Sequence, residues 1–259
     1  MRLVLLGTTG YHPSENRHTA CLMLPERGVL LDAGTGMFRA GRYLATDTLD
    51  IFLTHAHLDH VIGLTYLFDV LRGRTMTRVT VHAAEQALRA VEQHLLAEPL
   101  FPVKLPCEFR LLADRVTLGG GMRLQHFALE HPGGSVGYRL DGPGGSLAYV
   151  TDTTAGPDKA YVERLRGVDV LVHECYFPDA QAEFAVKTGH SCLSPVAEVA
   201  RRAAVGRLVL VHVDPLLEPP AALDLAPARA IFPNVELGYD LMEIDVSTRH
   251  GSSAPEAGR

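Results

Sequence analysis

The chain carries one stretch that is dense in metal-type ligands, Thr54-His55-Ala56-His57-Leu58-Asp59-His60. It follows the apolar run Ile51–Leu53, which is typical of a buried strand. Imidazole and carboxylate together suit borderline divalent metals such as zinc. Alternate side chains of an extended segment share a face, so His55 and His57 can converge on one ion. Asp59 and His60 then point to a second position as a helix begins, which predicts a two-metal centre.

Further apolar runs end in residues that could complete such a centre. These residues are Asp152 after 147–151, His173 and Glu174 after 168–172, His212 after 208–211, and Glu130 and His131 after 124–129. Buried strands that release polar residues at their ends build sites at one edge of a sheet. A single histidine of this kind is more often structural than a ligand. Four strand ends together favour one shared site.

Composition indicates a globular chain with a sizeable core. Hydrophobic residues make up 47% and charged residues 21% of the 259 residues, and nothing resembles an interdomain linker. We expect one domain over residues 1–246 and a disordered tail over 247–259, which is polar and lacks periodicity. A net charge of −6 gives no support for an overall basic nucleic-acid surface. Met1–Leu6 is too short for a secretory signal and no apolar run suggests a membrane span, so we expect a cytoplasmic protein.

The expected elements alternate between strands and helices. Strands are expected near 2–6, 20–24, 28–31, 49–53 and 78–81 and within 108–150, and helices near 58–71, 84–96, 157–166, 178–187 and 194–204. Ser194 is the expected N-cap of the last helix, with Pro195 at its first position. Two β-rich halves with interspersed helices fit an α/β fold, a four-layer αββα sandwich.

The ligand pattern resembles that of the metallo-β-lactamase-fold hydrolases. The resemblance rests on His55-x-His57-x-Asp59-His60, followed by His131, Asp152 and His212. Segments 6–10 and 31–36 look like the first sheet and the aspartate-glycine turn of that superfamily. Segments 189–191 and 238–244 resemble its branch of RNase Z and the phosphonate-pathway cyclic phosphodiesterase. The likeness spans residues 2–246 and implies the αββα sandwich.

The resemblance also implies which residues bind metal. One ion would take His55, His57 and His131, the other would take Asp59, His60 and His212, and Asp152 would bridge them. The implied cofactor is two divalent ions that activate a shared water. Zinc is favoured because His57 stands where a diiron relative would carry Glu, with manganese and iron as alternatives. Asp32 and Glu174 could orient ligand histidines or cap turns. His173 is assigned either to the rim of the site or to the core.

The implied catalytic residues are His190 and Asp59. In the phosphodiesterase branch, the histidine that matches His190 lies over the site and assists the departing alkoxide, as a general acid does. Gly189 before it and Ser191 after it match that branch. The alternative is an ordinary loop histidine bonded to the backbone beside Ser191.

The chain departs from the tRNA-processing members of the branch. Those members usually carry a long tRNA-gripping arm between the positions that match His131 and Asp152, where this chain has only 20 residues with a turn at 142–145. No basic cluster substitutes for the arm. The cysteines that bind a structural zinc in the phosphonate-pathway enzyme are absent from Thr8–Glu15.

We therefore expect a dinuclear hydrolase that cleaves a small or cyclic phosphodiester with a metal-bridging hydroxide. Its expected partner is a small-molecule phosphodiester rather than nucleic acid or a membrane. The sequence leaves the choice between a monomer and a homodimer undecided. Three alternatives remain. They are a hydrolase of a lactone, thioester or aryl sulfate, a tRNA 3′-processing endonuclease, and a low-turnover metal-binding protein with a biosynthetic or regulatory role.

Overall fold

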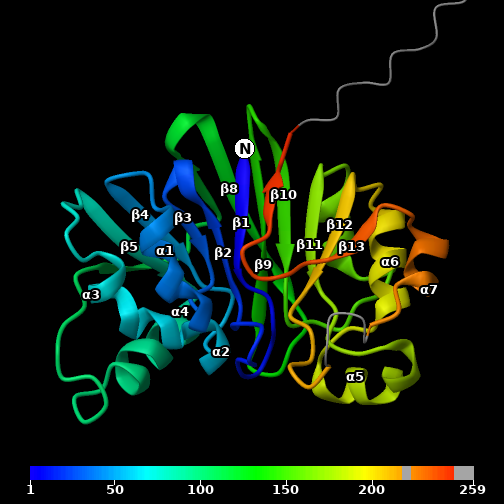
Figure 1. The fold of residues 1–259 in the computed structure, drawn as a ribbon, viewed down its shortest axis with the longest axis horizontal. Helices are drawn as coiled ribbons and strands as arrows, with labels where there is room; N and C mark the ends of the chain where they lie inside the picture. Colours follow the sequence, from blue (N-terminus) through cyan, green and yellow to red (C-terminus); the bar gives the residue numbers. More distant parts are fainter. Residues whose placement is uncertain (218–222, 248–259) are drawn as a thin grey trace, which may run out of the picture.

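Two β-sheets packed face to face, with helices on their outer faces, form the molecule (Figure 1). The computed structural model describes residues 1–217 and 223–247. The tail expected over 247–259 lies outside these residues, except for Ser247. The layers confirm the αββα sandwich. No helix in the described part of the chain is long and apolar enough to cross a membrane.

The first sheet comes mainly from the N-terminal half and has the strand order β14-β1-β2-β3-β4-β5-β6. Its strands are β14 Glu243–Asp245, β1 Arg2–Gly7, β2 Cys21–Leu24, β3 Val29–Leu31, β4 Thr48–Phe52, β5 Arg78–Ala83 and β6 Glu108–Leu111. Strands β3 to β6 run parallel, and β14 to β3 run antiparallel. The helices of this half are α1 Ala40–Tyr43, α2 Leu58–Val61, α3 Leu67–Val70 and α4 Glu85–Ala90.

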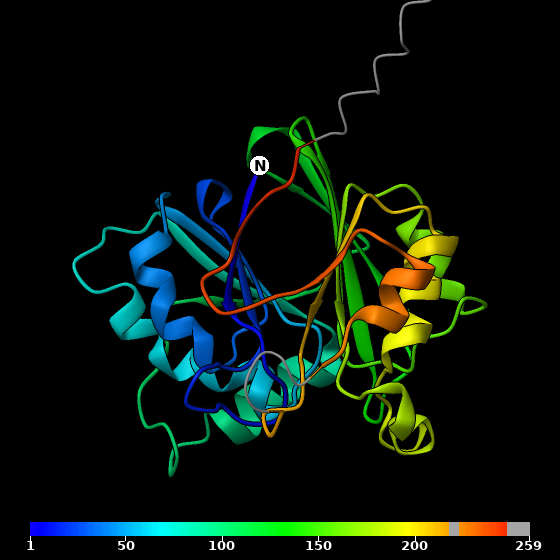
Figure 2. The same cartoon turned by 45° about the vertical axis from the view of Figure 1, so that its right-hand side comes forward.

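The second sheet has the order β13-β12-β11-β10-β9-β8-β7. Its strands are β13 Val235–Leu237, β12 Arg207–Val211, β11 Val170–Glu174, β10 Gly145–Val150, β9 Ser135–Gly142, β8 Met122–Leu129 and β7 Arg115–Leu118. Strands β10 to β13 run parallel, and β7 to β10 run antiparallel. Helices α6 Leu193–Arg202 and α7 Ala226–Ile231 cover its outer face, and α5 Ala182–Thr188 lies below them (Figure 2).

Strand periodicity explains how the core holds the layers together. In β1, Leu3 and Leu5 face the second sheet, whereas Val4 and Leu6 face the helices of the first half. Side chains of a strand alternate between faces, so one apolar strand contributes to two layers of the core. A third apolar layer packs α6 and α7 onto the second sheet.

The carboxyl ends of β4, β10, β11 and β12 reach the same edge of the sandwich, near α2 and α5 at the bottom of Figure 1. Parallel strands expose their terminal residues together at such an edge. The polar residues that the sequence places after these strands therefore come from both sheets and meet between them.

Candidate metal centre and active site

The structure brings the seven expected metal ligands together in two groups. The first cluster contains His55, His57, His131 and Asp152, and the second cluster contains Asp59, His60 and His212. Within each cluster one ligand atom per residue lies within 4.8 Å of the others. The ligands follow β4, β8, β10 and β12, so four strand ends supply them. The first and second clusters form a candidate binuclear metal site.

The carboxylate of Asp152 lies between the clusters and faces both. Its Oδ2 is 3.6 Å from His55 Nε2 and 3.5 Å from His131 Nε2. Its Oδ1 is 3.2 Å from His60 Nε2 and 3.3 Å from His212 Nε2. One side chain thus offers an oxygen to each position, as a bridging carboxylate does.

The donor atoms fit metal ions better than they fit one another. The Nε2 atoms of His60 and His212 lie 3.1 Å apart, and His131 Nε2 is 3.3 Å from His57 Nδ1. The buried Nε2 of His55 has no hydrogen-bond partner among the described residues. Ring nitrogens that face one another this closely cannot all be satisfied by hydrogen bonds. A divalent ion between them can instead coordinate the lone pair of each nitrogen. These residues therefore suit two divalent cations.

Groups behind the ligands fix the orientation of their rings. Asp32 accepts a hydrogen bond from His60 Nδ1 at 2.8 Å and from the Thr54 backbone N–H at 2.7 Å. Thr54 Oγ1 in turn lies 3.0 Å from His55 Nδ1. The Gly189 carbonyl lies 2.9 Å from His131 Nδ1. Each contact uses the ring nitrogen away from the centre, so Nε2 is left to bind metal.

The backbone at the centre adopts conformations that side chains rarely tolerate. Asp32, Asp152 and His212 have φ values of 60°, 47° and 52°, in the left-handed region. Such conformations cluster at functional sites and are held by their surroundings. Gly10 packs directly on His212, because a Cβ at this position would lie 2.3 Å from the ring.

Charges in the centre favour ionised carboxylates. Burial alone would raise the pKa of Asp152, but His212 and His60 hold it well below its usual range. Burial also opposes ionisation of Asp59, whose pKa is lowered by His60 and His212. Asp59 Oδ2 accepts a further hydrogen bond from the Tyr11 backbone N–H at 2.8 Å. Carboxylates held in this way are ready to bind cations without losing a proton.

His190 lies beside both clusters. A ring nitrogen of His190 lies within 4.8 Å of ligand atoms of Asp152 and His212. Its Nδ1 is 3.3 Å from Glu174 Oε1. Burial lowers the pKa of His190, but the hydrogen bond and the charge of Glu174 more than offset this and raise it. Tyr176, which our sequence reasoning missed, stacks on His190 with ring centroids 4.9 Å apart at 26°.

The Glu174 carboxylate is itself held by backbone groups. It accepts hydrogen bonds from the Thr153 N–H at 2.7 Å and the Ser191 N–H at 3.2 Å.

The neighbouring side chain of His173 points away from the centre. It is fully buried, and its Nε2 lies 3.1 Å from Tyr161 Oη in the core of the second half. Glu174 therefore faces the centre, while His173 belongs to the core.

Comparison with known proteins identifies the family. Residues 27–213 match the β-lactamase superfamily domain. The chain belongs to this superfamily. It is 31% identical to a ribonuclease Z of Synechococcus sp. strain CC9605 over 98% of this chain and 100% of that protein. It is thus an RNase Z-like, metal-dependent hydrolase, which confirms the family and the enzyme class expected from the sequence.

Solved structures agree on the fold. The metallo-β-lactamase fold protein YhfI from Bacillus subtilis superposes with a TM-score of 0.80 at 17% identity, covering 94% of this chain and 98% of that one. A diphosphatase from the PhnP family superposes with a TM-score of 0.70 at 20% identity, covering 94% and 97%. At these identities the likeness establishes the architecture.

Proposed function

We propose that this protein is a phosphodiesterase that cleaves a small or cyclic phosphodiester at a binuclear centre. The observation that carries the proposal is the Glu174–His190 pair beside the two clusters. A hydrolase of activated esters needs no acid for its leaving group, whereas cleavage of an alkyl phosphodiester expels a poorly leaving alkoxide. A positioned imidazolium supplies that missing proton.

The proposed ligand sets follow the two clusters. His55, His57 and His131 would hold one ion and the second cluster would hold the other, with Asp152 shared between them. When bound, two such ions act as Lewis acids that offset phosphoryl charge and lower the pKa of water. Zinc remains the proposed metal, because imidazole and carboxylate donors suit it.

His190 would act on the leaving group. Glu174 accepts the hydrogen bond from Nδ1, so the Nε2–H of the imidazolium is free to face the centre. As a water oxygen bonds to phosphorus and gives up a proton to solvent, the bond from phosphorus to the departing oxygen breaks. Its electron pair goes to that oxygen, which takes the Nε2 proton of His190. His190 is left neutral, still oriented by Glu174. The stacked ring of Tyr176 limits rotation of the imidazole.

The architecture between β9 and β10 supports a small substrate. These strands are joined by a two-residue turn, since Gly142 pairs directly with Gly145. The alignment to the Synechococcus ribonuclease Z runs over 333 positions, more than the 259 residues of this chain. That relative therefore has segments without a counterpart here.

A ribonuclease Z activity is the second candidate, because curated relatives at 28–31% identity carry that name. A tRNA substrate needs a large basic contact surface. The net charge of −6 and the short β9–β10 turn speak against such a surface. Cleavage of precursor tRNA with a higher kcat/KM than that of small phosphodiesters would favour this candidate.

A substrate panel tests the proposal. Zinc-loaded protein should cleave bis-p-nitrophenyl phosphate and a 2′,3′-cyclic nucleotide with higher kcat/KM than a lactone, a thioester, an aryl sulfate or precursor tRNA. Metal-stripped protein and protein reloaded with manganese or iron serve as controls. Preferential turnover of the lactone, thioester or sulfate would show that another ester class is the substrate.

A further inference from the structure

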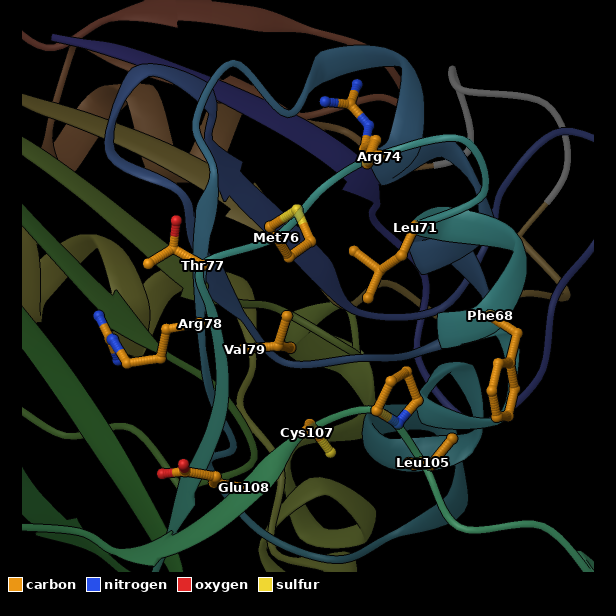
Figure 3. A pocket seen from close by; sticks show the side chains of 11 residues that line it. Phe68, Leu71, Arg74, Met76, Thr77, Arg78, Val79, Leu105, Cys107 and Glu108 are labelled. Atoms are coloured by element: carbon orange, nitrogen blue, oxygen red, sulfur yellow. The ribbon is translucent and has the colours of Figure 1, made fainter.

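The candidate centre borders a pocket of about 360 Å³ that none of the proposed roles uses. His55 and His57 of the first cluster form part of its wall. A larger pocket of about 590 Å³ lies between α3 and strands β5 and β6, where Phe68 and Met76 line it (Figure 3). No candidate metal ligand lines that larger pocket. The smaller pocket is therefore placed to receive part of a substrate bound at the centre.

Small residues keep this pocket open. Ala87 and Ala90 line it from one face of α4, at three-residue spacing, and Ala84 lines it from the N-cap position just before that helix. Gly133 and Gly134 of the loop before β9 also line it, with φ values of 84° and 81°. A Cβ at Gly134 would meet no atom within 4 Å. At these alanines and glycines the wall carries no side chain larger than a methyl group, which leaves the space open.

The lining is uncharged. It contains no Asp, Glu, Lys or Arg, and its polar members besides the two histidines are Thr54, Gln86 and Ser135. The buried Oγ of Ser135 has no hydrogen-bond partner among the described residues. A volume of about 360 Å³ falls within the ~300–1,000 Å³ typical of small-molecule sites. Away from the two histidines of the first cluster, the lining offers a charged group no ion-pair partner to offset its lost hydration, whereas a neutral apolar or planar group needs none.

We infer that this pocket is a substrate subsite that takes an uncharged, apolar or planar substituent of the phosphodiester. The inference rests on the proposed phosphodiesterase function. His57 is exposed and belongs to both the first cluster and the pocket wall, so the substituent reaches the pocket across this ring. A continuing polynucleotide would bring further phosphates into the uncharged lining, so the subsite selects a substrate with one phosphodiester.

Two esters with the same leaving group test the subsite. Phenyl p-nitrophenyl phosphate and methyl p-nitrophenyl phosphate differ only in the substituent that would enter the pocket. Wild-type, zinc-loaded protein should favour the phenyl ester by about tenfold or more in kcat/KM, the scale of discrimination that an apolar pocket provides. Ala90→Phe, which fills the pocket from α4, should bring the ratio close to one.

A second variant and a control guard against a folding defect. Ala84→Leu narrows the pocket from an exposed position, so it leaves the core intact and should also lower the ratio. Ala97→Leu adds the same side chain outside the lining and should leave the ratio unchanged. Equal rates for the two esters in the wild type, or a ratio that neither pocket variant alters, would overturn the subsite.

Failure of the proposed phosphodiesterase function gives a different result from failure of the subsite. If neither ester is cleaved, the phosphodiesterase proposal is wrong, and calorimetry with phenylphosphonate and methylphosphonate still measures the pocket. Tighter binding of phenylphosphonate that Ala90→Phe abolishes would support the subsite. Equal affinity of the wild type for the two phosphonates would refute it.

Discussion

At the scale of single residues, the centre depends on neighbours that are not ligands. Gly10 leaves room for the His212 ring, and Asp32 orients His60. Tyr176 and Glu174 hold His190 from two sides, by stacking and by a hydrogen bond. The chemistry proposed for the ligands and for His190 therefore requires these neighbours to stay in place.

Gly10→Ala should disturb the second cluster without removing any ligand. The added Cβ would lie 2.3 Å from His212 Cε1, so the ring must move. We expect the zinc content to fall from about two ions towards one per chain, because one ligand of the second ion is displaced. Elemental analysis measures this. Gly119→Ala, where a Cβ meets nothing within 4 Å, is the matched control. Two tightly bound ions in Gly10→Ala would contradict the packing argument.

Tyr176 should act through its ring rather than its hydroxyl. Tyr176→Phe keeps the stacked ring and should retain nearly full activity on an alkyl phosphodiester. Tyr176→Ala should lower kcat/KM by about 2–10-fold, since a stacked aromatic pair contributes about 0.5–1.5 kcal/mol. The same variant should lose less on a p-nitrophenyl ester, which needs no proton. A loss in Tyr176→Phe as large as in Tyr176→Ala would assign the role to the hydroxyl instead.

At the scale of elements, local sequence patterns predicted the strands better than the helices. Ser194 was the expected N-cap, yet α6 begins at Leu193, and Asp179 accepts bonds from Ser194 N and Oγ at 2.8 and 2.6 Å. The continuous helix expected over 58–71 is divided into α2, a 3₁₀ turn and α3. A Cβ at Gly63 would lie 2.3 Å from the Gly34 carbonyl, so this segment packs closely on another loop. Tertiary contacts of this kind leave no trace in helical periodicity.

Asp50 joins β4 to β5 and should make stability depend on pH. Its carboxylate accepts hydrogen bonds from Arg78 at 2.6 and 2.8 Å and from His82 at 2.9 Å. Burial alone would raise the pKa of Asp50, but His82 and Arg78 lower it. A pKa below the unfolded value means that the ionised carboxylate stabilises the fold above about pH 4, and that this contribution is lost as the pH falls further.

Asp50→Asn should therefore reduce the free energy of unfolding at pH 7 by about 1–2 kcal/mol, a range that allows for the partial exposure of Arg78. Urea unfolding at pH 7 and at pH 3 measures the difference between variant and wild type. The difference should shrink at pH 3, because the carboxyl of the unfolded chain, with its ordinary pKa of about 3.9, is then largely protonated. A difference that is the same at both pH values would rule out the ionised carboxylate as its source.

At the scale of the whole molecule, much of the architecture could be predicted because it follows from strand ends. The apolar runs before His55, Asp152 and His212 predicted that these residues lie together at strand ends, and the structure gathers them at one edge of the sandwich, from both sheets. Tyr176 could not be predicted as part of the site, because an aromatic residue after a strand is ordinary. The pocket beside His57 could not be predicted either, because alanine and glycine residues occur throughout the sequence and do not indicate a binding site.

The molecule as a whole should bind tRNA weakly. The net charge is −6 and a two-residue turn stands between β9 and β10. Few phosphate contacts are then available, and each contributes a slope of about −0.7 to −0.9 to the salt dependence of log K. Filter binding of precursor tRNA from 50 to 200 mM salt should show little specific affinity. Tight, specific cleavage of precursor tRNA near 150 mM salt would support ribonuclease Z activity as the function instead.

We propose that this hydrolase cleaves phosphodiesters with His190 as the acid for the leaving group. The most direct test compares kcat/KM of wild type and His190→Ala, at matched zinc loading, on a p-nitrophenyl phosphodiester and on an alkyl phosphodiester. We expect little loss on the first and a loss of about 10²–10⁴-fold on the second, the usual range for one positioned acid. Equal losses on both substrates, or no loss on either, would contradict the account.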